Sequence, residues 1–234
     1  MSGKVSTVGK VLELLSRRKP LLQVALDFTR LEEAARLVNS LSGLDVDIYE
    51  VGTPLIKSEG VKAVGVIKSL VPAASAVYAD MKICDVGSLE VSLAHEAGAD
   101  AVSVIGATDN AVIESAFNEA LKRNVDLVVD LIGVREIIAR IEELSKGLGI
   151  KVFEIHIGID AQRKGLGIAS VKDLIAEVKR RYPQIILAVA GGIKKDDVKI
   201  LKQLGVDIVI VGGYITRSSD PRKAAEEIIA ELRK

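Results

Sequence analysis

Residues 21–41 read LLQVALDFTRLEEAARLVNSL and contain the repeating unit that decides the fold. A short apolar run, 21–26, ends at Asp27 and precedes a segment in which apolar side chains recur every three or four residues. In that segment, one face of a helix would carry Leu31, Ala34, Ala35, Val38 and Leu41. The stretch therefore predicts a buried strand followed by an amphipathic helix, which together make one βα unit.

The same unit recurs along the chain after Pro20. Further apolar runs, each followed by a helical stretch, lie at 47–51, 75–80, 101–105, 126–130, 152–156, 185–189 and 208–211. Eight units in this length predict a single α/β domain over residues 21–234, a (β/α)8 TIM barrel. The alternative is an open doubly wound sheet, which favours a glycine-rich turn after its first strand, and LQVALDFTRLEE contains no glycine.

Residues 1–20, MSGKVSTVGKVLELLSRRKP, precede the first βα unit. Helical spacing relates Val8, Val11, Leu12 and Leu15, so this segment is predicted to be an N-terminal helical extension packed on the barrel. The alternative is a cleaved transit peptide, which should be poor in acids, and Glu13 argues against it.

Composition and charge narrow the class of protein. Lys plus Arg and Asp plus Glu number 32 each, so no overall field attracts nucleic acid or an anionic membrane. No apolar run approaches the roughly 20 residues that span a bilayer. The single cysteine, Cys84, cannot form an internal disulfide, which predicts a reducing, cytoplasmic setting. With 49% hydrophobic and only 3% aromatic residues, the core must consist of Val, Ile, Leu and Ala.

Polar side chains gather where the predicted strands end, and barrels of this kind carry their active sites at that end. The strand ends carry Asp27, Glu50, Asp80 with Lys82, Asp130 and His156. One acid at such a place commonly opens a turn or caps a helix, but a set in register points to a common site. The imidazole of His156, near its ordinary pKa, could move a proton at neutral pH. The other histidine, His95, falls in the helical stretch LEVSLAHEAG and is predicted to be a surface or packing residue.

The segment 75–87, SAVYADMKICDVG, carries the densest charge. Asp80 and Lys82 are two residues apart and so share a face of the strand, while Asp85 begins the following helical turn. The three predict a charged array at the barrel mouth. The alternative is an ordinary salt bridge with a helix cap, which would be costly to bury without a ligand. Cys84 has no paired base in the motif and is assigned to packing.

Two glycine pairs, Gly191–Gly192 and Gly212–Gly213, follow the seventh and eighth predicted strands. Barrels often bind phosphate at this place through backbone N–H groups, so the pairs predict a phosphorylated substrate. The alternative is that the glycines only allow tight turns from strand to helix.

These blocks together identify a resemblance. From about residue 21 onward the chain resembles the 3-hexulose-6-phosphate synthases, in the suprafamily of orotidine monophosphate decarboxylase. The resemblance rests on LQVALD, YEVGTPLI, ADMKICDVG, HEAGADAVSVIG, VVDLIGV, HIGIDAQ, AVAGGIK and IVIVGGYIT. It implies a reversible, Mg²⁺-dependent aldol condensation of formaldehyde with D-ribulose 5-phosphate, which gives D-arabino-hex-3-ulose 6-phosphate.

The resemblance also implies roles for particular residues. Glu50 and Asp80 would help to hold Mg²⁺, and Lys82 would stabilise an enediolate. His156 would transfer the proton. Asp27 and Asp130 would contact substrate hydroxyls or ordered water. Finally, Asp85, with Thr53 in a similar role, would reach into the site of a partner subunit in a homodimer.

Departures from the family patterns bear on the choice of reaction. The related 3-keto-L-gulonate-6-phosphate decarboxylases have arginines where this chain has Ile159 and Gly213, which favours the aldolase. Compared with the synthases, Ile83-Cys84 replaces a common Thr-Met pair, and Tyr214 replaces a small residue. The alternatives that remain are a sugar-phosphate decarboxylase, an aldolase that uses Lys82 as a Schiff-base nucleophile, and a non-catalytic barrel that binds phosphosugars.

Overall fold

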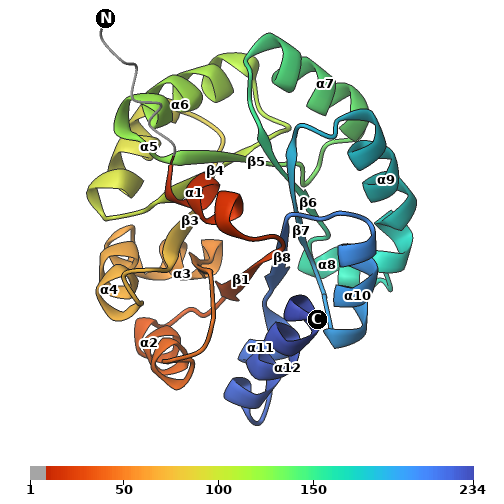
Figure 1. The fold of residues 1–234 in the computed structure, drawn as a ribbon. Helices are drawn as coiled ribbons and strands as arrows, with labels where there is room; N and C mark the ends of the chain where they lie inside the picture. The colour runs from red at the N-terminus through yellow and green to blue at the C-terminus, as the bar shows by residue number, and fades with distance from the viewer. Residues whose placement is uncertain (1–8) are drawn as a thin grey trace, which may run out of the picture.

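The strands close into a parallel barrel. In the computed structural model, which describes residues 9–234, strands pair in sequence order and β8 closes the ring against β1 (Figure 1). The strands are β1 (Leu21–Leu26), β2 (Ile48–Val51), β3 (Ala76–Ile83), β4 (Ala101–Ile105), β5 (Asp126–Asp130), β6 (Val152–His156), β7 (Ile186–Ala190) and β8 (Ile208–Val211). The predicted (β/α)8 barrel is confirmed.

Helices surround the barrel as an outer ring (Figure 1). The ring consists of α2 (Leu31–Ser40), α4 (Lys62–Leu70), α5 (Gly87–Glu96), α6 (Asn110–Arg123), α7 (Ile137–Gly147), α9 (Ile168–Arg181), α10 (Lys195–Gln203) and α12 (Pro221–Arg233). Short helices begin soon after the ends of three strands: α3 (Thr53–Glu59) after β2, α8 (Ile159–Arg163) after β6, and α11 (Gly213–Thr216) after β8. These short helices lie at the end of the barrel where the predicted site residues gather.

Strand bounds agree closely with the prediction, except in β3. The predicted bounds hold for β1, β4, β5, β6 and β8, while β2 begins one residue later than predicted and β7 is displaced by one residue at both ends. β3 continues to Ile83, three residues past the predicted end at Asp80. Its pairing with β4 shifts register between Ala79 and Ile83, and Lys82 has φ +47°, in the left-handed region. A bulge therefore separates Asp80 from Lys82.

Two predictions in the segment after β3 need correction. α5 begins at Gly87, so Asp85 lies in an exposed bend before the helix and does not begin its first turn. Its Oδ1 accepts a hydrogen bond from Val86 N at 2.8 Å. The assignment of Cys84 to packing is wrong, because its side chain lies in the same connection and is exposed.

Two apolar layers hold the barrel together. The larger layer lies between strands and outer helices. The smaller one fills the inside of the barrel and is rich in alanine, with Ala25, Ala76, Ala101, Ala188 and Ala190 among its members. Polar side chains occupy the inside toward the carboxyl ends of the strands.

The N-terminal helix α1 (Lys10–Arg17) packs over the opposite, amino-terminal end of the barrel. Val11 and Leu15 are buried in the inner apolar layer. Asp126, at the start of β5, accepts hydrogen bonds from the first-turn amides Val11 N at 2.8 Å and Leu12 N at 3.3 Å. The prediction of a helix packed on the barrel agrees with this placement, although Val8 lies outside the described residues. None of the helices within residues 9–234 combines the length and apolar character that crossing a membrane requires.

Candidate active site

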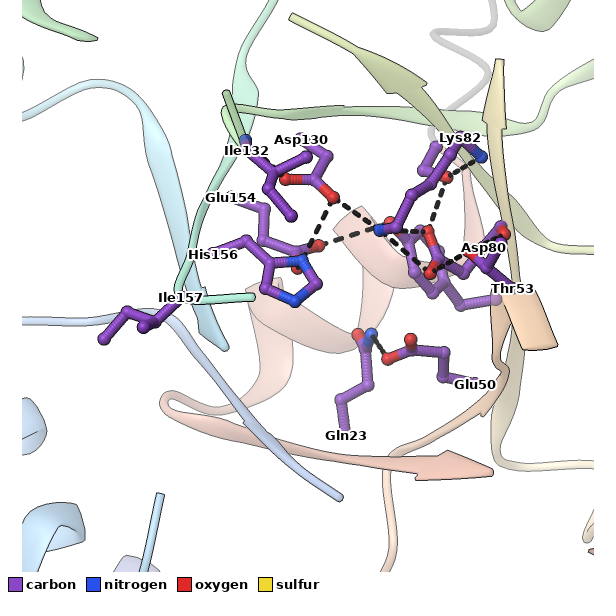
Figure 2. A network of polar contacts seen from close by, with 12 residues as sticks. Gln23, Glu50, Thr53, Asp80, Lys82, Asp130, Ile132, Glu154, His156 and Ile157 are labelled. Carbon is purple, nitrogen blue, oxygen red and sulfur yellow. Dashed lines mark hydrogen bonds and ion pairs between the residues drawn. The ribbon is translucent and has the colours of Figure 1, made fainter. Parts of the chain in front are cut away.

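Charged and polar side chains from β1, β2, β3, β5 and β6 converge inside the carboxyl end of the barrel (Figure 2). Part of this cluster faces a cavity of about 1390 Å³, whose wall includes Asp27, Glu50, Asp80, Lys82 and His156. Asp130 belongs to the cluster but does not line the cavity, and neither does Asp85.

Lys82 lies at the centre of the cluster. Its Nζ is 3.0 Å from Asp80 Oδ2 and 2.6 Å from Asp130 Oδ2, and its side chain is only 19% exposed. Burial alone would lower the pKa of Lys82, but the charges of Asp80 and Asp130 outweigh it and hold the pKa above its ordinary value. Lys82 is therefore a fixed ammonium group, which argues against its use as a Schiff-base nucleophile, because that role needs a free amine.

The backbone beside Lys82 is held by a residue of the neighbouring strand. Ser103, fully buried in β4, accepts a hydrogen bond from Lys82 N at 2.8 Å and donates one to Asp80 Oδ1 at 2.8 Å. Thr53 Oγ1 at the start of α3 donates to Asp80 Oδ2 at 2.6 Å. Both carboxylate oxygens of Asp80 are thus fixed, and the predicted site residue Thr53 contacts the cluster of its own chain.

His156 is held by two acids. Its Nδ1 lies 3.1 Å from Asp130 Oδ2 and 3.2 Å from Glu154 Oε1. Burial alone would lower the pKa of His156, but these hydrogen bonds raise it to about 11. The structure therefore differs from the expectation of a near-ordinary pKa. With its pKa raised by Asp130 and Glu154, His156 is an imidazolium at neutral pH.

Asp130 holds the two cationic side chains of the site, Lys82 and His156. It is completely buried and absent from the cavity wall. Its Oδ1 accepts from Ile132 N at 2.8 Å, while Oδ2 faces Lys82 and His156. Both oxygens are therefore occupied by protein groups. The predicted role of Asp130 was contact with substrate hydroxyls or ordered water, whereas in the structure it orients Lys82 and His156.

The remaining acids are less tied to cations. Glu50 Oε2 accepts from Gln23 Nε2 at 2.7 Å, and burial together with the charges of Asp80 and Asp27 raises the Glu50 pKa well above its usual range. Asp27 is open to the cavity, yet burial by the surrounding walls and the charge of Asp80 raise its pKa too. An added cation would relieve this repulsion, and binding it would release protons.

Two sets of side chains are candidates for holding a metal. The predicted ligands Glu50 and Asp80 offer oxygen donors that face the cavity, which is the chemistry that Mg²⁺ prefers. Asp130, Glu154 and His156 also have ligand atoms within 4.8 Å of one another. Lys82 pairs with an acid of each set, so charge compensation alone does not separate them. Glu50 and Asp80 both line the cavity, whereas Asp130 and Glu154 do not, and the first set is therefore the more accessible to Mg²⁺.

Both glycine pairs also line the cavity. Gly191 has φ +114° and Gly192 has φ +68°, both in the left-handed region that favours glycine. A Cβ atom on Gly191 would also lie 2.6 Å from the Ile157 Cβ. At Gly191 the absence of a side chain is therefore a requirement of the local structure.

Sequence reasoning missed three polar residues of the cluster: Gln23, Ser103 and Glu154. Each lies inside an apolar strand and is buried. Glu154 is two residues before His156 and therefore on the same face of β6, so the period of two along the strand could have revealed it. His95 lies half-buried on α5 and does not line the cavity, in agreement with the prediction.

Known proteins resemble the chain over most of its length. Residues 20–228 match the profile of the Orotidine 5'-phosphate decarboxylase / HUMPS family. A 3-hexulose-6-phosphate synthase of Bacillus subtilis (strain 168) is 39% identical over 207 residues, which cover 88% of this chain and 96% of that protein. The solved 3-hexulose-6-phosphate synthase from Salmonella typhimurium is 39% identical with a TM-score of 0.84, covering 92% of this chain and 99% of the other. A 3-keto-L-gulonate-6-phosphate decarboxylase from Vibrio cholerae is 27% identical with a TM-score of 0.78, covering 92% and 98%.

Proposed function

Because the chain belongs to the Orotidine 5'-phosphate decarboxylase / HUMPS family and is an enzyme, we propose that it catalyses the Mg²⁺-dependent, reversible condensation of formaldehyde with D-ribulose 5-phosphate. The product is D-arabino-hex-3-ulose 6-phosphate. The observation that carries the proposal is the Lys82 ammonium, held between Asp80 and Asp130 and facing the cavity. A fixed cation at this place stabilises an enediolate formed from the ketose.

Glu50 and Asp80 would hold Mg²⁺, which would supply a second positive charge for the developing enediolate oxygens. The protein contributes the orientation of these carboxylates. Gln23 fixes Glu50, and Thr53 and Ser103 fix Asp80. Since neither acid has to reorganise during the reaction, the charge that develops meets a preorganised site.

His156 transfers the proton. After the resting imidazolium has released its proton to solvent, the neutral imidazole removes a proton from C1 of ribulose 5-phosphate and leaves the enediolate. The imidazolium formed in this step donates that proton to the oxygen of formaldehyde while C1 of the enediolate forms the new bond to the formaldehyde carbon, so the proton removed from carbon ends on the new hydroxyl group. Asp130 and Glu154 hold the ring in place for both steps. Asp27, open to the cavity, contacts substrate hydroxyls.

The phosphate lies at the glycine pairs. The turns at Gly191–Gly192 and Gly212–Gly213 bring backbone to the cavity wall without intervening side chains. This arrangement is typical of phosphate sites after the last two strands of a barrel. The substrate then extends from the glycine pairs toward Lys82 and His156.

A homodimer with shared sites completes the proposal. Asp85 is exposed and does not line the cavity of its own chain, so it is available to a neighbouring subunit. Exposed apolar side chains follow it on the same segment, namely Val86, Leu89 and Leu93. Such an apolar patch favours association of two copies. A cytoplasmic location remains a prediction from the cysteine content.

The test uses purified protein, Mg²⁺, ribulose 5-phosphate and ¹³C-formaldehyde. We expect loss of the formaldehyde signal and appearance of a labelled C1 hydroxymethyl group of the hexulose phosphate by NMR, with activity abolished by EDTA and restored by Mg²⁺. Absence of formaldehyde consumption would refute the proposal. Release of CO₂ from a 3-keto-sugar-acid phosphate in place of this reaction would establish the decarboxylase alternative. Activity in EDTA with borohydride trapping on Lys82 would establish the Schiff-base alternative.

A further inference from the structure

Arg217 lies directly over Gly213. α11 is a single turn, and Arg217 N donates a hydrogen bond to Gly213 O at 3.2 Å as the helix ends. Residues four apart share a helix face, and side chains lean toward the helix N-terminus. The guanidinium of Arg217 consequently folds back onto the glycine. A Cβ atom at position 213 would lie 2.8 Å from Arg217 Cζ and 3.0 Å from Arg217 Nε, with Nη2 closer still.

Within residues 9–234, Arg217 takes part in none of the ion pairs within 4.0 Å and none of the side-chain hydrogen bonds. It also lines the main cavity, in contrast to most exposed arginines of the chain. The ammonium of Lys82, by comparison, already has two carboxylate partners. Arg217 thus presents an uncommitted cation to the space in front of the second glycine pair.

The second glycine pair has a charge of each sign beside it. A Cβ atom on Gly212 would lie 3.4 Å from Asp27 Oδ2, whereas Gly213 is covered by Arg217. Asp27 is close to the reaction centre: burial and the charge of Asp80 raise its pKa, while the charges of His156, Lys82 and, from the other side of the glycine pair, Arg217 lower it. A carboxylate repels a phosphate and accepts hydrogen bonds from hydroxyl groups. The two residues therefore favour one orientation of a sugar phosphate, with its phosphate toward Arg217 and its hydroxyl groups toward Asp27.

We propose that the guanidinium of Arg217 binds the phosphate of the sugar-phosphate ligand and thereby selects phosphorylated over unphosphorylated sugars. The inference rests on the proposed function for the class of ligand. A guanidinium presents a planar fork of donors that matches two phosphate oxygens. The absence of a side chain at Gly213 gives that fork room to lie against the backbone of the turn. Arg217 is a binding residue and takes no part in proton transfer.

The test compares Arg217→Gln and Arg217→Lys with Arg180→Gln. Arg180 is exposed near the end of α9, does not line the cavity, and changes the net charge equally when replaced by Gln. Calorimetric titration with inorganic phosphate measures binding without catalysis. Steady-state kinetics with ribulose 5-phosphate and with ribulose measure the contribution of the phosphate.

For Arg217→Gln we expect phosphate binding weakened about 10-fold or more, and KM for ribulose 5-phosphate raised by a similar factor while kcat changes little. Arg217→Lys should lie between, because a lysine keeps the charge but loses the fork. Arg180→Gln should match the wild type. Wild-type phosphate affinity in Arg217→Gln, or an equal loss of activity toward ribulose, would overturn the inference. If the wild type fails to condense formaldehyde while phosphate binding still depends on Arg217, the proposed reaction fails and the inference stands.

Discussion

Replacement of Ser103 by alanine should impair both the stability and the chemistry of the protein. The hydroxyl group of Ser103 accepts from Lys82 N and donates to Asp80 Oδ1, both at 2.8 Å, in a fully buried position. The same contacts hold Lys82 at φ +47°, a conformation that costs a residue with a Cβ about 1–2 kcal/mol. Ser103 therefore fixes the bulge from which both charged groups enter the cavity.

The structure sets the size of the effect. Without the hydroxyl, the partly buried N–H of Lys82 loses its acceptor, at a cost of about 1–3 kcal/mol. Asp80 loses one of several donors, which adds about 1 kcal/mol. We therefore expect Ser103→Ala to lower the free energy of unfolding by about 2–4 kcal/mol. Because Lys82 and Asp80 lose their fixed geometry, kcat should fall more than about tenfold with a smaller change in KM.

Ser103→Thr is the matched variant, since it keeps the hydroxyl group and adds one methyl group to the same site. Urea denaturation gives the stability, and formaldehyde consumption with ribulose 5-phosphate gives kcat and KM. The threonine variant should recover most of kcat even if the extra methyl group lowers stability. Equal kcat values for the alanine and threonine variants, or an alanine variant as active as the wild type, would show that the hydroxyl group does not position Lys82.

Three further predictions concern other parts of the barrel. Burial raises the pKa of Asp126 from 3.8 to about 6, so the folded state binds a proton more tightly than the unfolded state. The free energy of unfolding should therefore fall by up to about 3 kcal/mol as pH rises from 4 to 6. Denaturation curves of Asp126→Asn should lack this pH dependence, and a variant with the wild-type pH profile would contradict the prediction. The Asp85→Asn and Lys82→Ala variants should each be inactive, but an equal mixture should regain about a quarter of wild-type activity. About half of the dimers are then hybrids, and each hybrid has one intact site of two. If a hybrid dimer is shown to form and activity does not return, the sites are not shared. Gly191→Ala should weaken binding of inorganic phosphate, because the turn at φ +114° leaves no room beside Ile157; unaltered affinity by calorimetry would place the phosphate elsewhere.

The fold could be predicted because each βα unit carries its own signal. Strands with both faces buried read as short apolar runs, and the intervening segments have helical periodicity. The side chains of Asp80, Lys82 and His156 converge because parallel strands of a barrel bring their carboxyl ends to one mouth. Asp80 and Lys82 both line the cavity, as expected for residues that share a face. The sequence does not show the bulge between them, where Lys82 N donates a hydrogen bond to Ser103 in the next strand.

Electrostatics were harder to predict than position. The pKa of His156 depends on Glu154 of its own strand and on Asp130 of the neighbouring strand. The spacing along β6 indicates the first contact, but the second is a three-dimensional property that the sequence does not show. The sequence did not reveal three polar residues of the site, because a single polar residue within an apolar run resembles an interruption of the core. In the barrel these residues face inward and pair with the charged groups, namely Gln23, Ser103 and Glu154.

The two ends of the barrel differ in function: the carboxyl end carries the cavity, and α1 covers the amino-terminal end. By covering the alanine-rich interior at the amino-terminal end, it seals the side of the barrel that does no chemistry (Figure 1). Changes there should shift the melting temperature while leaving substrate turnover untouched. A protein or tag fused ahead of α1 would sit on the face remote from the cavity, so immobilisation through this end should leave the entrance open to sugar and aldehyde.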